Sequence, residues 1–153
     1  PAMPYEYLDD ATTADVAFRV EAATLEQLLS DAAEALTGAM VEDLASVAPL
    51  QTRTLEVADQ PVDLLLFDLL QELVYLKDAE GLLLRVESVT LGGAGDAERN
   101  DAAAIRSVTV RVRGEPIDPV RHDLHVDVKA ITLHGFRVAR TAAGLEAFVI
   151  VDV

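Results

Sequence analysis

Apolar residues recur along this chain with two different periods, one of two residues and one of three to four. Alternation begins at Asp15, where Val16, Phe18 and Val20 share one face, and predicts a half-buried strand. The final stretch, residues 146–153, is a nearly continuous run of β-branched residues, which is typical of a strand buried on both faces. Similar patterns predict five further strands, over residues 52–58, 82–91, 105–113, 126–134 and 136–139.

A helix is predicted over residues 24–40. Thr24 and Gln27 form a capping box, in which the threonine hydroxyl accepts a backbone N–H of the first turn and the glutamine reaches back. Leucines and alanines then recur at helical spacing on one face. Three polar residues of this helix lie off that face and are expected to contact solvent: Asp31, Glu34 and Thr37.

A second helix is predicted to open at residues 59–61 and to run through Leu76 towards Gly81. Proline is tolerated in the first turn, where its missing N–H has no partner, and glycine often ends a helix. The apolar surface of this helix is broad, which indicates that other elements cover it from more than one side. Its polar strip is expected to be a solvated face: Asp68, Gln71 and Glu72.

The order of these elements is strand, helix, strand, helix and then five strand-like segments. It predicts an α+β fold in which two main helices pack against a largely antiparallel β-sheet or sheets. Residues 82–91 and 105–113 are expected to form a hairpin around a glycine-rich loop. No second domain is visible, so residues 1–153 are expected to form a single domain, with residues 1–4 as a loose leader.

The charge of the chain excludes some classes of function. Twelve Lys and Arg stand against 27 Asp and Glu, a net charge of −15, so we expect no direct binding of nucleic acid. The absence of cysteine excludes disulfides and thiolate chemistry. No apolar stretch is long enough to cross a membrane and the chain starts without a signal peptide, so no membrane is expected and a cytoplasmic location follows by default.

Motifs for hydrolytic or phosphate-binding enzymes are missing from the sequence. The three histidines form no H-E-x-x-H motif, no serine lies in a G-x-S-x-G elbow, and the glycine-rich loop precedes a strand, unlike a P-loop. We expect His122, His125 and His134 to lie at the surface or beside a site, without forming a zinc centre. The sequence therefore does not predict an enzyme.

Carboxylates near predicted strand ends are the strongest candidates for chemistry. Asp152 alternates onto the face of Phe148 and Ile150, where an ionised carboxylate requires a cation, hydrogen-bond donors or exposure at a chain end. Together with three residues near the first strand it would suit a hard cation bound by oxygen: Asp9, Asp10 and Asp15. Lys129 and His134 stand out near strand positions.

Five stretches of the chain, in order, resemble the archease family. They are Tyr5-Glu6-Tyr7-Leu8-Asp9 with Thr13-Ala14-Asp15, Thr24-Leu25-Glu26, Gly114-Glu115-Pro116-Ile117-Asp118 with Arg121-His122, Val128-Lys129-Ala130-Ile131-Thr132-Leu133-His134, and Val149-Ile150-Val151-Asp152-Val153. Two positions depart from the family pattern. The histidine before Thr-Ala-Asp is replaced by the insert Asp10-Ala11-Thr12, and the tyrosine of the fourth stretch is Leu133.

The resemblance implies a metal site and a function. Its ligands would be Asp15, Asp152 and the backbone carbonyl of Val153, with Ca²⁺ as the first candidate cation and Mg²⁺ or Mn²⁺ as alternatives. Lys129 matches a family residue linked to function. Three residues are candidates for accessory metal or partner contacts: Asp9, Lys129 and His134.

The implied function is that of a non-catalytic activator of the RtcB-type RNA ligase. That ligase joins a 2′,3′-cyclic phosphate or 3′-phosphate end to a 5′-hydroxyl through a guanylylated histidine, and the activator promotes guanylylation and multiple turnover in tRNA splicing and RNA repair. Two alternatives stay open. One is a small metal-dependent enzyme acting on nucleotides or phosphate esters, with His134 as acid or base; the other is a cation-binding, chaperone-like module.

Overall fold

The computed structural model describes residues 4–8, 15–93 and 105–153. Two α-helices and a short 3₁₀ helix run over these residues: α1 (Leu25–Met40), η1 (Leu44–Ser46) and α2 (Val62–Glu80). The strands are β1 (Tyr5–Leu8), β2 (Asp15–Ala22), β3 (Gln51–Pro61), β4 (Leu82–Gly93), β5 (Ile105–Pro116), β6 (Ala130–Thr141) and β7 (Gly144–Asp152).

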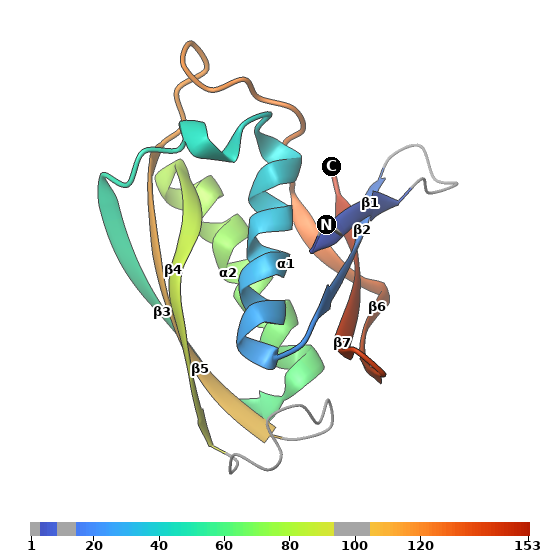
Figure 1. Ribbon diagram of the computed structural model, residues 1–153. Coiled ribbons are helices and arrows are strands. Elements are labelled where there is room, and N and C mark those ends of the chain that lie inside the picture. Colours follow the sequence, from blue (N-terminus) through green and yellow to red (C-terminus); the bar gives the residue numbers. More distant parts are fainter. Residues whose placement is uncertain (1–3, 9–14, 94–104) are drawn as a thin grey trace.

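The strands form two antiparallel sheets, and both main helices lie between them (Figure 1). One sheet has the order β1-β2-β7-β6, and the other has the order β3-β5-β4. Helix α1 packs against β4 on one side and β2 on the other, while α2 contacts β3 and β6. The predicted α+β class is confirmed, and the two sheets explain why the apolar surface of α2 is so broad.

Local sequence signals position both helices, with two departures from the prediction. Residues 59–61, predicted to open the second helix, belong to β3, and α2 begins at Val62. The Gln27 side chain donates to Asp31 and does not reach back to complete a capping box. The Thr24 hydroxyl accepts the N–H of Gln27 at 3.2 Å and caps α1. Gly81 ends α2 with φ 67°, a left-handed conformation that glycine adopts without strain from a Cβ atom. The core between the sheets is filled by fully buried side chains from helices and strands, including Phe18, Leu28, Leu66, Leu83 and Leu145.

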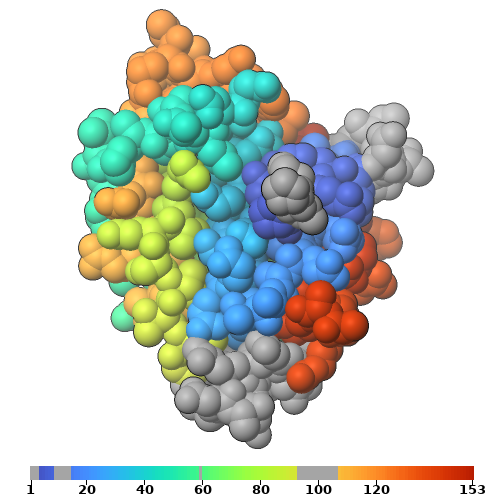
Figure 2. All heavy atoms as spheres, viewed as in Figure 1, coloured from blue at the N-terminus to red at the C-terminus, as the bar shows by residue number. Residues whose placement is uncertain are grey.

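The prediction that the polar residues of α1 face solvent is wrong for Asp31 and Thr37. Both are buried, because a sheet covers each side of the helix. Burial raises the pKa of Asp31, although a hydrogen bond from Gln27 Nε2, at 2.7 Å, opposes that rise. The Thr37 hydroxyl donates to the Leu84 carbonyl at 2.8 Å and so links α1 to β4. Figure 2 shows the strip of α1 that stays at the surface between β4 and the first two strands.

The polar strip of α2 faces solvent only in part. Asp68 and Glu72 are exposed, as predicted. Gln71, in contrast, is half-buried, and its side-chain oxygen accepts the N–H of Ile131 at 2.9 Å. Gln71 therefore links α2 to the start of β6.

Strand β7 is covered on one face only, so the prediction of burial on both faces is wrong. Leu145, Ala147, Val149 and Val151 are buried against the helices, whereas the residues between them are half-buried or exposed. The alternation itself is confirmed. Asp152 lies on the outer, less covered face with Phe148 and Ile150.

Strand boundaries near the two ends of the chain also differ from the prediction. Residues 126–129 are not in a strand, and 130–141 form one strand that passes through Gly135 with an irregular register. Glycine fits there because its φ is 72°. Strand β1 was not predicted, since four residues are too few for a clear period. The hairpin of β4 and β5 is confirmed.

No helix among the described residues is both long enough and apolar enough to span a bilayer.

Candidate metal and partner site

The structure brings Asp15 and Asp152 together at one end of the four-stranded sheet. Asp15 begins β2, Asp152 ends β7, and the two are direct cross-strand partners in an antiparallel pair. Directly opposed residues have Cβ atoms about 4.5–5.5 Å apart, so the two carboxyl groups are within reach of one shared cation. The expected proximity of the two aspartates is therefore confirmed.

The outer face of this sheet becomes apolar just below the carboxylate pair. Ala17 pairs with Ile150, and Phe148 lies one step further along β7. With Leu8 and Gly135 these residues line a shallow pocket of about 340 Å³. The guanidinium of Arg137 stacks over the Phe148 ring, 4.1 Å from its centroid. The two aspartates thus border a small apolar patch, which ends on the other side at Arg19, the cross-strand partner of Phe148.

Lys129 is hydrogen-bonded through its backbone to the end of β7. Its backbone N–H donates to the Asp152 carbonyl at 2.8 Å, and the next residue, Ala130, is the cross-strand partner of Asp152 on the other side. Lys129 is exposed. Asp152 and Lys129, both candidate site residues from the sequence, are therefore joined by a backbone hydrogen bond.

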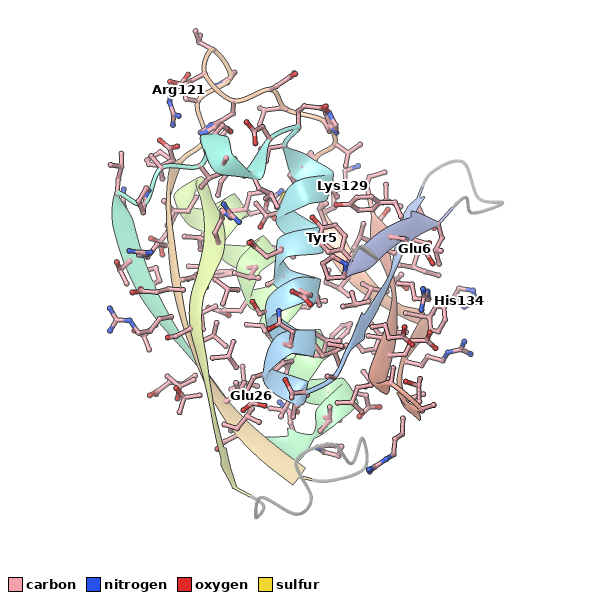
Figure 3. The ribbon with its side chains drawn as sticks, viewed as in Figure 1. Tyr5, Glu6, Glu26, Arg121, Lys129 and His134 are labelled. Atoms are coloured by element: carbon pink, nitrogen blue, oxygen red, sulfur yellow. The ribbon has the colours of Figure 1, made fainter. Side chains whose placement is uncertain are left out.

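His134 lies further along β6, in the irregular part of the strand. It is exposed, and its N–H donates to the Thr132 hydroxyl at 3.0 Å. It lies within the register shift between Thr132 and Arg137, so no residue of β7 is its cross-strand partner. The pairing of β6 with β7 therefore does not bring His134 into the row of Asp15 and Asp152, and Figure 3 shows His134 away from Lys129.

The other predicted site residues are Asp9, Asp10 and Val153. Asp9 and Asp10 lie outside the described residues. Val153 follows Asp152 directly and is half-buried.

The chemistry of the aspartate pair fits a hard cation. Two carboxylates held opposite each other repel, and a divalent cation between them would offset that repulsion. Within residues 4–8, 15–93 and 105–153, no cluster of three or more His, Cys, Asp or Glu side chains suits a metal ion. Asp15 and Asp152, with the Val153 carbonyl, would hold such a cation at the sheet end.

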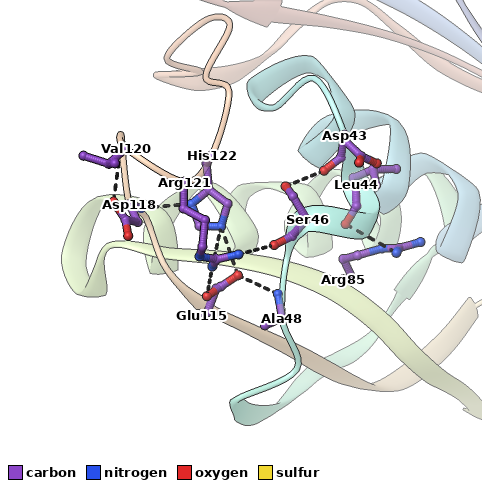
Figure 4. Close-up of polar contacts among 10 residues, drawn as sticks. All are labelled: Asp43, Leu44, Ser46, Ala48, Arg85, Glu115, Asp118, Val120, Arg121 and His122. Atoms are coloured by element: carbon purple, nitrogen blue, oxygen red, sulfur yellow. Dashed lines mark hydrogen bonds and ion pairs between the residues drawn. The ribbon is translucent and has the colours of Figure 1, made fainter.

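His122 is buried, so the prediction that the histidines lie at the surface or beside a site is wrong for this residue. Its Nδ1 accepts the N–H of Asp118 at 2.9 Å, which leaves Nε2 to carry the ring hydrogen and donate to Glu115 at 3.0 Å (Figure 4). His125 contacts Glu42 at the surface. The three histidines therefore lie in three different environments.

Glu115 is the centre of the contacts around His122. It accepts the N–H of Ala48 at 2.5 Å and contacts the Arg121 guanidinium (Figure 4). These bonds, the one from Ala48 first, lower the pKa of Glu115 from its ordinary 4.5 to about 2. Because the partners belong to two separate loops, Glu115 and His122 join those loops and have a structural role. In the sequence, the residues around Glu115 indicate only a turn, so this structural role could not be predicted.

The family model described as the Archease protein family (MTH1598/TM1083) matches residues 5–153. The chain belongs to the archease family. Protein archease of Methanopyrus kandleri is 35% identical over 150 residues, which cover 98% of this chain and 99% of that protein. The archease assignment made from the five sequence stretches is confirmed.

Solved structures agree with this assignment. The solution structure of protein 1598 of Methanobacterium thermoautotrophicum is 27% identical, covers 98% of this chain and 99% of that one, and superposes with a TM-score of 0.78. The crystal structure of an archease and possible chaperone from Thermotoga maritima has a TM-score of 0.61 over 95% of this chain and 96% of that one. At 17% identity, the second likeness shows the fold alone.

Proposed function

We propose that this archease is a non-catalytic, cation-binding activator of an RtcB-type RNA ligase. In this role it promotes guanylylation and multiple turnover of the ligase during tRNA splicing and RNA repair. The observation that supports the proposal best is the position of Asp15 opposite Asp152, with Lys129 bonded to the same strand end. The archease resemblance links these three residues to function, and their backbones are neighbours at one end of the sheet.

The charge of the chain supports a protein partner over RNA itself. At a net charge of −15 the surface repels nucleic acid and attracts a basic protein, whose approach it would accelerate at low salt. The exposed end of β7 and the apolar face beside it would contact the ligase. Ca²⁺, Mg²⁺ or Mn²⁺ held by Asp15 and Asp152 would order that end of the sheet by neutralising two adjacent negative charges.

Among the described residues, the strand pairing gives no support for catalysis by this chain. An acid or base must reach the reacting group within about 3 Å or through one water, and the strand pairing does not bring His134 opposite either aspartate. The chaperone-like alternative has one point in its favour, which is that the Thermotoga maritima archease is described as a possible chaperone. It predicts protection of unrelated unfolded proteins, which is separable from ligase activation.

One assay separates the proposal from the enzyme alternative, and an added test of the aggregation of an unrelated protein separates it from the chaperone alternative. The chain is incubated first alone, with nucleotides, RNA ends and each divalent cation, and then with a cognate ligase under conditions of multiple turnover. The proposal predicts no product from the chain alone and faster ligase guanylylation and RNA joining in the mixture. Turnover by the chain alone would support the enzyme. Suppression of the aggregation of an unrelated protein, without an effect on the ligase, would support the chaperone.

A further inference from the structure

Lys77 is a buried lysine near the C-terminal end of α2, and its contacts lead to the aspartate pair. Its side chain is only 5% exposed. The ammonium donates to the Val128 carbonyl at 2.7 Å and contacts the carboxylates of Asp127 and of Asp78, the latter at 2.7 Å. Burial acts to lower the pKa of Lys77, but the hydrogen bonds to Asp127 and Asp78 raise it above its ordinary value. The Lys77 side chain is therefore charged, and it binds α2 to the segment that contains Asp127 and Val128.

Lys77 binds a segment that precedes β6 and has no regular secondary structure. This 127–129 segment consists of Asp127, Val128 and Lys129. Val128 is fully buried, so its carbonyl oxygen needs a donor. On the other side of the segment, the Lys129 N–H donates to the Asp152 carbonyl. The 127–129 segment is thus held from α2 by Lys77 and from β7 by Asp152.

We propose that Lys77 is a positioning residue that holds the 127–129 segment in place, so that Lys129 stays beside the Asp15 and Asp152 pair. The proposal rests on the proposed function, in which Lys129 contributes to activation of the ligase. Lys77 itself is buried, so its side chain contributes little to the exposed surface. It acts through the segment, by fixing the backbone from which the exposed Lys129 side chain projects.

The Lys77 ammonium contacts two carboxylates, and replacing each in turn distinguishes a positioning role from a general effect on stability. Asp127 lies on the segment, whereas Asp78 lies on α2 next to Lys77. Their side chains are both well exposed, 73% for Asp127 and 57% for Asp78. Asp127→Ala and Asp78→Ala each remove one ion pair between Lys77 and an exposed carboxylate, and both variants should fold. Only the loss of Asp127 would loosen the segment.

Amide hydrogen exchange of Lys129 is the direct measurement, because its N–H forms the bond to Asp152. We expect Asp127→Ala to speed this exchange by about threefold or more, and Asp78→Ala to leave it unchanged. Lys77→Met also removes the donor to the buried Val128 carbonyl, and a folded variant should show an increase of about tenfold or more. Equal effects of the two alanine variants, or no effect of either, would overturn the proposal.

Ligase stimulation tests whether the position of Lys129 matters. Lys77→Met is expected to stimulate as poorly as Lys129→Met, and the double variant no worse than either, because Lys77 acts through Lys129. Independent losses that multiply in the double variant would contradict the proposal. Should Lys77→Met fail to fold, Asp127→Ala replaces it in the same comparison.

The exchange measurement also separates the two claims. A wild-type protein that stimulates no ligase would refute the proposed function, while Lys129 exchange would still decide whether Lys77 holds the segment. Normal stimulation by a variant whose Lys129 exchange is fast would refute the positioning role and leave the proposed function standing.

Discussion

Replacing Asp152 by asparagine should stabilise the protein in a chelator and abolish its response to divalent cations. Asp15 and Asp152 are direct cross-strand partners, and like charges in that arrangement are destabilising by about 0.2–1 kcal/mol. For a chain of this length, 1 kcal/mol corresponds to about 2–4 °C in Tm. Asp152→Asn removes one of the two charges and keeps the shape of the side chain. In EDTA its Tm should therefore rise by up to about 4 °C.

The same variant should behave in the opposite way when a cation is present. A cation at 100 times its Kd stabilises the native state by about 2.7 kcal/mol, which is roughly 5–11 °C in Tm for a domain of this size. We expect wild type to gain this rise with Ca²⁺, Mg²⁺ or Mn²⁺, and Asp152→Asn to lose it. Thermal melting by circular dichroism, with a titration of each cation, measures both effects.

The matched control is Asp68→Asn. Asp68 is exposed and accepts a hydrogen bond from Gln60 at 2.8 Å, so its replacement should change stability by less than about 0.5 kcal/mol and leave the cation response intact. A cation response of Asp152→Asn equal to that of wild type would show that the ion binds elsewhere. A lower Tm of Asp152→Asn in EDTA would contradict the expected repulsion between the two carboxylates.

Three further predictions concern the fold. Hydrogen bonds and the Arg121 guanidinium lower the pKa of Glu115 in the folded state to about 2. The stability that its ionised form contributes is therefore complete above pH 4.5 and is lost as the pH falls towards 2. In urea unfolding across this pH range, the free energy of unfolding should fall less for Glu115→Gln than for wild type. Thr37→Val leaves the Leu84 carbonyl without its donor and should lower the free energy of unfolding by about 1–3 kcal/mol in urea titrations. Gly81→Ala forces a Cβ atom into a left-handed φ of 67° and should cost about 1–2 kcal/mol, read from Tm; an unchanged Tm would refute the strain.

The helices and most strands follow from local signals in the sequence. Thr24 and Gly81 mark helix ends through hydrogen bonding and φ preference, which act within a few residues and can be recognised in a single chain. The burial of Thr37 could not be predicted in this way, because it depends on a second sheet formed by distant segments. The helical period of apolar residues predicts which face of a helix contacts the core, but it does not show how many sheets pack against that helix.

The candidate site shows the same division. Alternation along the last strand correctly separated the face of Asp152 from that of Val151, and the pairing with Asp15 was expected from two carboxylates at strand ends. Lys77 had no such signal, because a lysine in a leucine-rich helix predicts a solvated position. Its partners, Asp127 and the Val128 carbonyl, are about 50 residues away in the chain, so only the fold reveals the contact.

Stimulation of a cognate RtcB-type ligase by Asp152→Ala, compared with Asp68→Ala, tests the central claim most directly. Ligase guanylylation and RNA joining are measured under multiple turnover, after circular dichroism and thermal melting have shown that both variants are folded. We predict that Asp152→Ala no longer stimulates the ligase while Asp68→Ala remains close to wild type. A folded Asp152→Ala that stimulates as well as wild type would show that the carboxylate pair is not the functional centre.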